Sequence, residues 1–220
     1  MATPLLGRPS PPHDPAAARG LGAGFARWTR LVEDVFARPR LLVALLAVYV
    51  PFFVLFFASS VSFSLPHAAV ACHGQPVLDQ RWGYSAAQVA DYLRECGVSG
   101  RAAIAAQQGA DLVYPALFGA VLTVAFALLL SALRLPDRHW AHALVLLPAI
   151  SATADYLENI GIRVLLVAYP EQPSIVPAMS AVTAVKLATG WACMGVLVML
   201  AAAAGGRRLR SMAARRAAGV

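Results

Sequence analysis

Four long apolar segments limit the folds that are open to this chain. They cover residues 41–63, 112–133, 140–168 and 176–203. Each reaches the roughly 20 residues that a helix needs to cross the apolar core of a bilayer. Because backbone polar groups find no water in that core, a single segment of this kind spans it as a helix. The sequence therefore predicts an all-α, polytopic membrane protein with a bundle of four transmembrane helices.

The composition agrees with a membrane protein. Hydrophobic residues make up 59% of the 220 residues and charged residues 13%, whereas soluble domains carry about 25% charged residues. The net charge is +7, but the arginines gather at the ends of apolar segments instead of along one surface. We therefore expect membrane lipid as a partner and no nucleic acid.

The arginines also predict an orientation. Residues 1–40 contain six of them before the first segment, two lie between the second and third segments, and five follow the fourth. The connection 64–111 holds three arginines balanced by four acidic residues. The positive-inside rule then places both termini in the cytoplasm and the connection 64–111 outside. Abundant alanine and a single lysine favour a bacterial source, so the expected location is the cell (inner) membrane.

The flanks of the spans have their own character. Residues 1–24 are rich in Pro, Gly and Ala and predict a disordered cytoplasmic tail. Residues 25–38 place apolar side chains at helical spacing, which predicts an amphipathic helix on the membrane surface. Residues 206–220 form a basic cytoplasmic tail. A single four-span domain over residues 25–205 remains.

The extracytoplasmic connection carries helix signals. Ser85 and Gln88 form a capping box, and Gly97 is a suitable helix stop. Ser99 can cap a further helix that continues through Gln107 into the second span. The sequence thus predicts a helical loop outside the membrane.

Two cysteines, Cys72 and Cys96, lie in this connection. An oxidising exterior permits a disulfide between them, and two unpaired thiols are the alternative. The neighbouring His67 and His73 do not provide the fixed ligand spacing of a metal site. We expect neither a metal nor a cofactor.

The third apolar segment contains polar residues that share one helix face. These are Ser151, Asp155, Glu158, Asn159 and Arg163. A charge near the middle of a bilayer costs at least about 2.5–3.5 kcal/mol, so the two carboxylates need compensation.

Lys186, the single lysine, lies in the fourth segment at the same depth as Glu158, about 15 Å from the outer end at ~1.5 Å per residue. The third and fourth spans are joined by a short loop and should pack as antiparallel neighbours. We expect Lys186 to pair with Asp155 or Glu158, with Thr183 close by.

Two further residues open the second span on the outer side. Asp111 and Tyr114 lie at a depth that Arg163 should reach. Arg163 and Asn159 would then complete a network around the carboxylates.

Two interpretations of this polar cluster stay open. It is a structural ion pair, which predicts close packing without a cavity, or it is a functional site, as intramembrane ionisable residues often are. The functional interpretation favours binding or transport of a small molecule or lipid, or a membrane subunit. The alternative is an intramembrane enzyme that acts on an apolar substrate, with Asp155 or Glu158 as acid or base and Lys186 as electrostatic partner. An enzyme requires a cavity beside the cluster.

Several short motifs have a familiar order. They are G-Y-S-A-A-Q-V at 83–89, G-V-S-G-R at 97–101, D-L-V-Y-P at 111–115, D-Y-L-E-N at 155–159, Y-P at 169–170 and T-A-V-K at 183–186. Together they resemble a family of uncharacterised bacterial four-span integral membrane proteins over roughly residues 40–205. The resemblance implies the four-span fold and no established activity.

Overall fold

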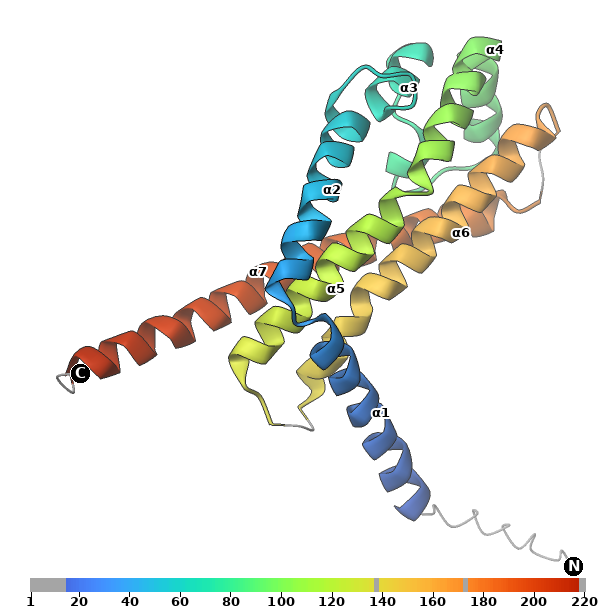
Figure 1. Cartoon of the computed structure of the whole chain (residues 1–220). Helices are drawn as coiled ribbons and strands as arrows, with labels where there is room; N and C mark the ends of the chain where they lie inside the picture. The colour runs from blue at the N-terminus through green and yellow to red at the C-terminus, as the bar shows by residue number, and fades with distance from the viewer. Residues whose placement is uncertain (1–14, 137–138, 172–173, 218–220) are drawn as a thin grey trace, which may run out of the picture.

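The structure is a computed structural model that describes residues 15–136, 139–171 and 174–217, and within these ranges all regular elements are helical. Its centre is α5 (Tyr114–Leu133), which packs against α2 (Pro39–Ala58), α6 (Leu147–Ala168) and α7 (Val176–Ala217). Figure 1 shows these helices side by side, with α1 and the end of α7 projecting away from the pole that holds α3 and α4. The predicted all-helical class is confirmed.

Three stretches are long and apolar enough to cross a membrane, and they indicate a membrane protein. They are α2, the run Ala86–Leu133 that ends with α5, and α7. The 22-residue α6 is long enough but carries Asp155, Glu158 and Arg163. By length and apolarity alone the described chain therefore has three candidate spans. That α6 is a further span stays a prediction.

The helix ends follow local hydrogen bonding more than hydropathy. The first segment was expected to reach residue 63, but α2 ends at Ala58. The Ser59 hydroxyl donates to the Leu55 carbonyl at 2.5 Å and accepts the Val61 N–H at 3.3 Å. Such local bonds compete with the helix ladder, so the apolar residues beyond Ser59 lie outside the helix.

The third segment is divided into two elements. A 3₁₀ helix, η2, covers Trp140–Leu146, and α6 begins at Leu147. Pro148 occupies the first turn of α6, where its missing N–H is not needed. The α-helical part is thus shorter than the predicted range 140–168.

The last helix is longer than expected. It was predicted to end near residue 203, followed by a basic tail over 206–220, but α7 continues to Ala217. Alanine and arginine dominate this extension and are strong helix formers, so the helix persists through Gly205 and Gly206. The predicted tail is therefore helical as far as it is described.

The connection between α2 and α5 is largely helical. It contains α3 (Leu65–Ala71), the short 3₁₀ helix η1 (Leu78–Gln80) and α4 (Ala86–Asp111). The Ser85–Gln88 capping box is present. Gly97 adopts φ 63° and breaks the helical geometry of α4, a conformation that glycine reaches without a Cβ penalty.

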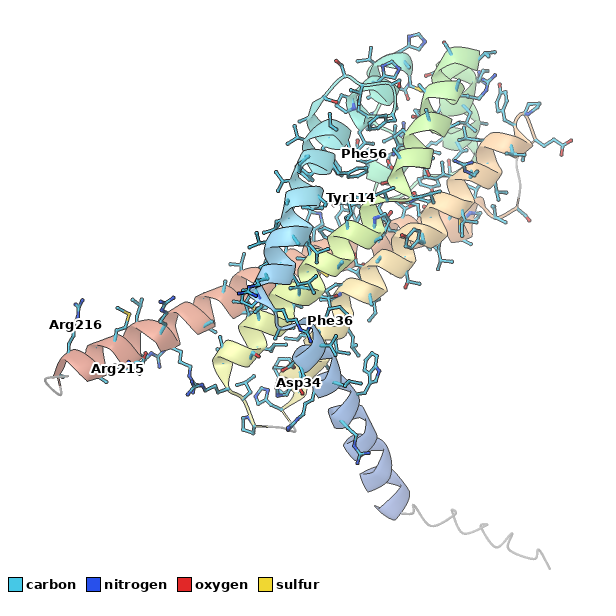
Figure 2. The ribbon with its side chains drawn as sticks, in the orientation of Figure 1. Asp34, Phe36, Phe56, Tyr114, Arg215 and Arg216 are labelled. Atoms are coloured by element: carbon cyan, nitrogen blue, oxygen red, sulfur yellow. A yellow bond between two sulfur atoms is a disulfide. The ribbon has the colours of Figure 1, made fainter. Side chains whose placement is uncertain are left out.

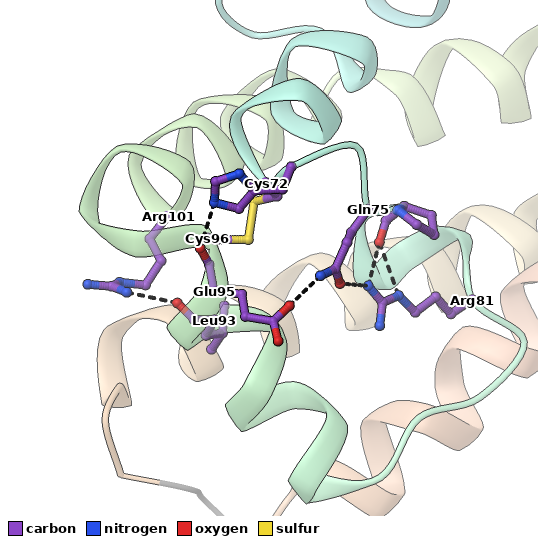
Figure 3. Close-up of a disulfide and its surroundings, with 9 residues drawn as sticks. Cys72, Gln75, Arg81, Leu93, Glu95, Cys96 and Arg101 are labelled. Atoms are coloured by element: carbon purple, nitrogen blue, oxygen red, sulfur yellow. Dashed lines mark hydrogen bonds between the residues drawn. A yellow bond between two sulfur atoms is a disulfide. The ribbon is translucent and has the colours of Figure 1, made fainter.

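A disulfide joins Cys72, after α3, to Cys96 in α4 (Figure 3). Hydrogen bonds surround it: Gln75 Nε2 donates to the Glu95 carboxylate at 2.5 Å, and Arg81 donates to the Pro76 carbonyl at 2.7 Å. The segment between α3 and α4 is thereby attached to α4.

The first helix differs from its prediction in its extent and in the burial of one charged residue. α1 covers Pro15–Phe36, so residues 15–24 belong to a helix and not to a tail, and residues 1–14 lie outside the described chain. Pro15 at the first turn and the alanines after it favour helix. An amphipathic helix on the membrane surface would expose its charged residues, but Glu33 is buried and contacts His142 Nδ1 at 2.5 Å.

Candidate functional site

The close approach of α6 and α7 positions the polar cluster. A Cβ added at Gly161 on α6 would overlap with the Met179 sulfur on α7. Glycine thus lets the two helices pack closely, as small residues do between membrane helices. Lys186 follows Met179 by two helical turns on α7 and therefore faces the acids of α6.

Lys186 lies between two carboxylates. Its Nζ is 3.4 Å from Asp155 Oδ1 and in contact with Glu158 Oε2. The side chains of Lys186, Asp155 and Glu158 are only 15%, 7% and 0% exposed. Mutual attraction in such a buried place offsets part of the cost of removing each charge from water. The cluster keeps an excess of acid, because one ammonium serves two carboxylates.

A third carboxylate, Asp79, reaches the cluster from η1. It is 4% exposed, and its Oδ2 accepts hydrogen bonds from Gln107 Nε2 at 3.2 Å and Gln108 Nε2 at 3.5 Å. Its Oδ1 is buried and has no hydrogen-bond partner in the described part of the chain. Burial raises the pKa of the Asp79 carboxyl, while the charge of Lys186 acts in the opposite direction.

Hydrogen bonds also fix the loop before α4 to α7. The Tyr84 N–H donates to Ser180 Oγ at 2.9 Å, and the Tyr84 hydroxyl lies 3.1 Å from Thr183 Oγ1. Thr183 is fully buried, one turn from Lys186. The loop thus covers the cluster and is bonded to the helix that supplies its ammonium.

A cavity of about 700 Å³ lies beside the ion pair. Four charged residues line it, and we call them its charged side: Asp79, Asp111, Asp155 and Lys186. Six aromatic rings from α2 and α5 also line it, and we call them its aromatic wall: Tyr49, Phe53, Phe56, Phe57, Tyr114 and Phe118. Rings of this wall contact one another, with Phe57 and Tyr114 centroids 5.1 Å apart. Figure 2 shows Phe56 and Tyr114 on the neighbouring helices α2 and α5.

Most of the predicted polar residues meet at this cavity. Ser151 lines it opposite Gly190, and Asp111 and Tyr114 line it as well. Asn159 lies behind them and donates from Nδ2 to the Asp111 carbonyl at 3.3 Å. The expectation of close packing without a cavity, which belonged to the purely structural interpretation, is therefore not met.

Arg163 does not complete the network. It was expected to reach Asp111 and Tyr114, but it is exposed on α6, and its guanidinium lies on the side of Gly109 of α4. A long cationic side chain keeps its head group in a polar environment when it can. The carboxylates of the cluster thus have Lys186 as their cationic partner among the described residues.

Asp79, Gln107 and Gln108 were missed as site residues. The signal for the glutamines is present in the sequence, because the buried face of α4 continues at helical spacing from Ala103 and Ile104 to these amides. Polar residues on such a face predict a buried polar partner. Asp79 has no comparable periodic signal.

The described residues contain no group of three or more His, Cys, Asp or Glu side chains suited to a metal ion. Cys72, next to His73, is bonded to Cys96. The polar groups beside the cavity are arranged as ion pairs and amide hydrogen bonds, which suit an organic ligand or a proton.

The comparisons with known proteins add no relative. No protein-family model, curated protein or solved structure matches this chain. The chemistry of the cavity therefore carries the functional conclusion.

Proposed function

We propose that the protein crosses the cell (inner) membrane four times, with both termini in the cytoplasm. The span beyond the three apolar candidates is α6, which is the third in chain order. Its exposed apolar residues follow one stripe at spacings of three, four and seven, namely Ile150, Leu157, Ile160, Val164 and Val167. Such a stripe suits contact with lipid, while the charged face of α6 is directed toward α7. At ~1.5 Å per residue its 22 residues reach about 33 Å, enough for the bilayer core.

Within this membrane domain the cavity binds a small, largely apolar molecule or part of a lipid. The observation that carries this function is the cavity itself, which lies beside a buried ion pair and has an aromatic wall. Sites for small molecules are typically apolar with a few converging polar groups. A binding protein and a transporter would both use this ligand site. 

An intramembrane enzyme is the second candidate. Asp155 and Lys186 both line the cavity at 3.4 Å from each other, so a carboxylate acid or base and an electrostatic partner border the same space. In this case Asp155→Asn would abolish turnover of a bound apolar substrate and leave its binding intact.

Cavity filling tests the binding function. Three probes share a phenyl ring and differ in charge: benzyltrimethylammonium, the neutral neopentylbenzene and phenylmethanesulfonate. Equilibrium binding to the detergent-purified full chain is compared with that of Gly190→Leu, whose new side chain enters the cavity. Gly195→Leu on the same helix is the matched control, because a Cβ at Gly195 meets nothing within 4 Å.

At least one probe is expected to bind the wild type and Gly195→Leu with the same affinity and to lose binding in Gly190→Leu. Partition of a probe into the detergent micelles is the same for all three proteins, so it cancels when their binding is compared. Equal uptake by the three proteins for every probe would overturn the function.

A further inference from the structure

The charges around the cavity do not balance. Asp79, Asp111 and Asp155 face it with three carboxyl groups, whereas Lys186 provides one ammonium. That ammonium is already engaged, since it contacts Asp155 and Glu158. Any ligand in the cavity therefore meets more carboxyl groups than ammonium groups.

Among the carboxyl groups that line the cavity, Asp79 carries an oxygen whose hydrogen-bonding capacity is unused. Asp79 is 4% exposed and lines the cavity, and its Oδ1 lacks a hydrogen-bond partner in the described chain. A buried polar atom without a partner costs free energy, and a positively charged group in the cavity would remove that cost. Burial also raises the pKa of Asp79, as expected for a carboxyl whose surroundings lack a sufficient counter-charge.

The aromatic wall selects the same kind of ligand. The faces of aromatic rings attract cations and repel anions. Phe57 and Tyr114 meet edge to face at 5.1 Å, and Phe53 stacks on Phe57 at 4.6 Å, so the wall is continuous across α2 and α5. Trp191 on α7 lines the cavity as well.

From these observations we infer that the ligand is an organic cation with an apolar body, such as a substituted ammonium, held between the aromatic wall and the Asp79 carboxylate. An inorganic cation fits poorly, because hard metal ions need a shell of several oxygen ligands, and the described residues offer no such group. This inference rests on the proposed binding function and specifies its ligand class.

The three phenyl probes distinguish a failure of this inference from a failure of the proposed binding function. Benzyltrimethylammonium is expected to bind at least about tenfold more tightly than neopentylbenzene, its neutral isostere, and phenylmethanesulfonate to show no saturable binding. If the neutral probe binds as well as the cation in a Gly190-dependent manner, the binding function stands and the cation inference fails. If no probe shows Gly190-dependent binding, both fail.

A charge-removing variant locates the cation. Asp79→Asn keeps the size of the side chain and is expected to lower the affinity for benzyltrimethylammonium about tenfold, with the affinity for neopentylbenzene unchanged. Asp91→Asn is the matched control, since Asp91 is exposed on α4 and pairs with Arg94 outside the cavity. An equal effect of the two variants on the cation would overturn the role of Asp79.

The ammonium could belong to a free amine or to a lipid headgroup. Dihexanoylphosphatidylcholine, below its micellar concentration, provides the second arm of the same assay. Saturable, Gly190-dependent binding of this lipid in competition with benzyltrimethylammonium assigns the site to a headgroup. Binding of benzyltrimethylammonium without such competition assigns it to a free organic cation. The wild-type comparison does not depend on the folding of any variant at Asp79.

Discussion

The hydroxyl of Tyr84 lies 3.1 Å from the hydroxyl of Thr183, so the loop before α4 is bonded to the turn of α7 that precedes Lys186. Thr183 also donates to the Met179 carbonyl at 3.1 Å. Together with the bond from the Tyr84 N–H to Ser180 Oγ, this buried contact joins the loop that covers the site to the helix that carries Lys186.

Removing this contact should loosen the cover. We expect Tyr84→Phe to lower the free energy of unfolding by about 0.5–1.5 kcal/mol, the typical contribution of one hydrogen bond. Denaturant titration of the purified protein in micelles, combined with Thr183→Val in a double-mutant cycle, measures the coupling. If Tyr84→Phe lowers the free energy of unfolding by the same amount in the Thr183→Val background as in the wild type, the two hydroxyls do not interact.

The ion pair of Lys186 predicts a non-additive pair of substitutions. Lys186→Met leaves Asp155 and Glu158 buried without their cation and should cost about 3–5 kcal/mol of stability. Adding Glu158→Gln removes one of these charges and should recover part of the loss. Arg94→Met is the control, because Arg94 and Asp91 are 67% and 55% exposed and exposed pairs contribute about 0–1 kcal/mol. Similar losses for Lys186→Met and Arg94→Met would contradict a buried ion pair.

The approach of α6 to α7 depends on Gly161. Gly161→Ala places a methyl group on the Met179 side chain and should destabilise the fold by about 1–3 kcal/mol through overpacking. The loss should shrink in a Met179→Ala background. Gly195→Ala, which meets open space, should instead be neutral or stabilising by up to about 1 kcal/mol because alanine favours helix. Thermal unfolding of the wild type and of these variants checks this, and equal shifts at the two glycines would refute it.

The raised pKa of Asp79 predicts a pH dependence of stability. Burial makes the folded state hold the Asp79 proton to a higher pH than the unfolded state. Its contribution to stability is therefore fully present below the unfolded pKa of about 4 and is lost as the pH rises through the folded pKa. Asp79→Asn lacks this contribution, so the stability of the wild type relative to the variant should fall as the pH rises above about 4. A difference that is constant with pH would contradict the assignment.

Periodicity and capping predicted much of the fold because both act locally. The Ser85 capping box and the break at Gly97 were predicted from neighbouring residues alone. The pairing of Lys186 with the acids of α6 followed from depth and a short connection, which leave an antiparallel helix pair few alternatives.

The remaining features depend on contacts between distant segments. Asp79 enters the site because η1 packs against α7, and no local pattern in the sequence encodes that contact. Glu33 lies on the charged side of an amphipathic helix, but it is buried against its tertiary partner His142, which lies far away in the sequence. Arg163 was expected in the cluster from its spacing alone, whereas the length of its side chain allows it to stay exposed.

Lys186 is the single lysine among the 220 residues, and it borders the cavity. The chain therefore has one side-chain amine, located at the place where a ligand would bind. A small acylating reagent can modify that amine and the N-terminal amine, and the mass of the intact protein distinguishes the two products after a single proteolytic cut. The rate of Lys186 acylation, with and without a competing molecule, measures how accessible the cavity is. The measurement requires no substitution to introduce a reactive residue.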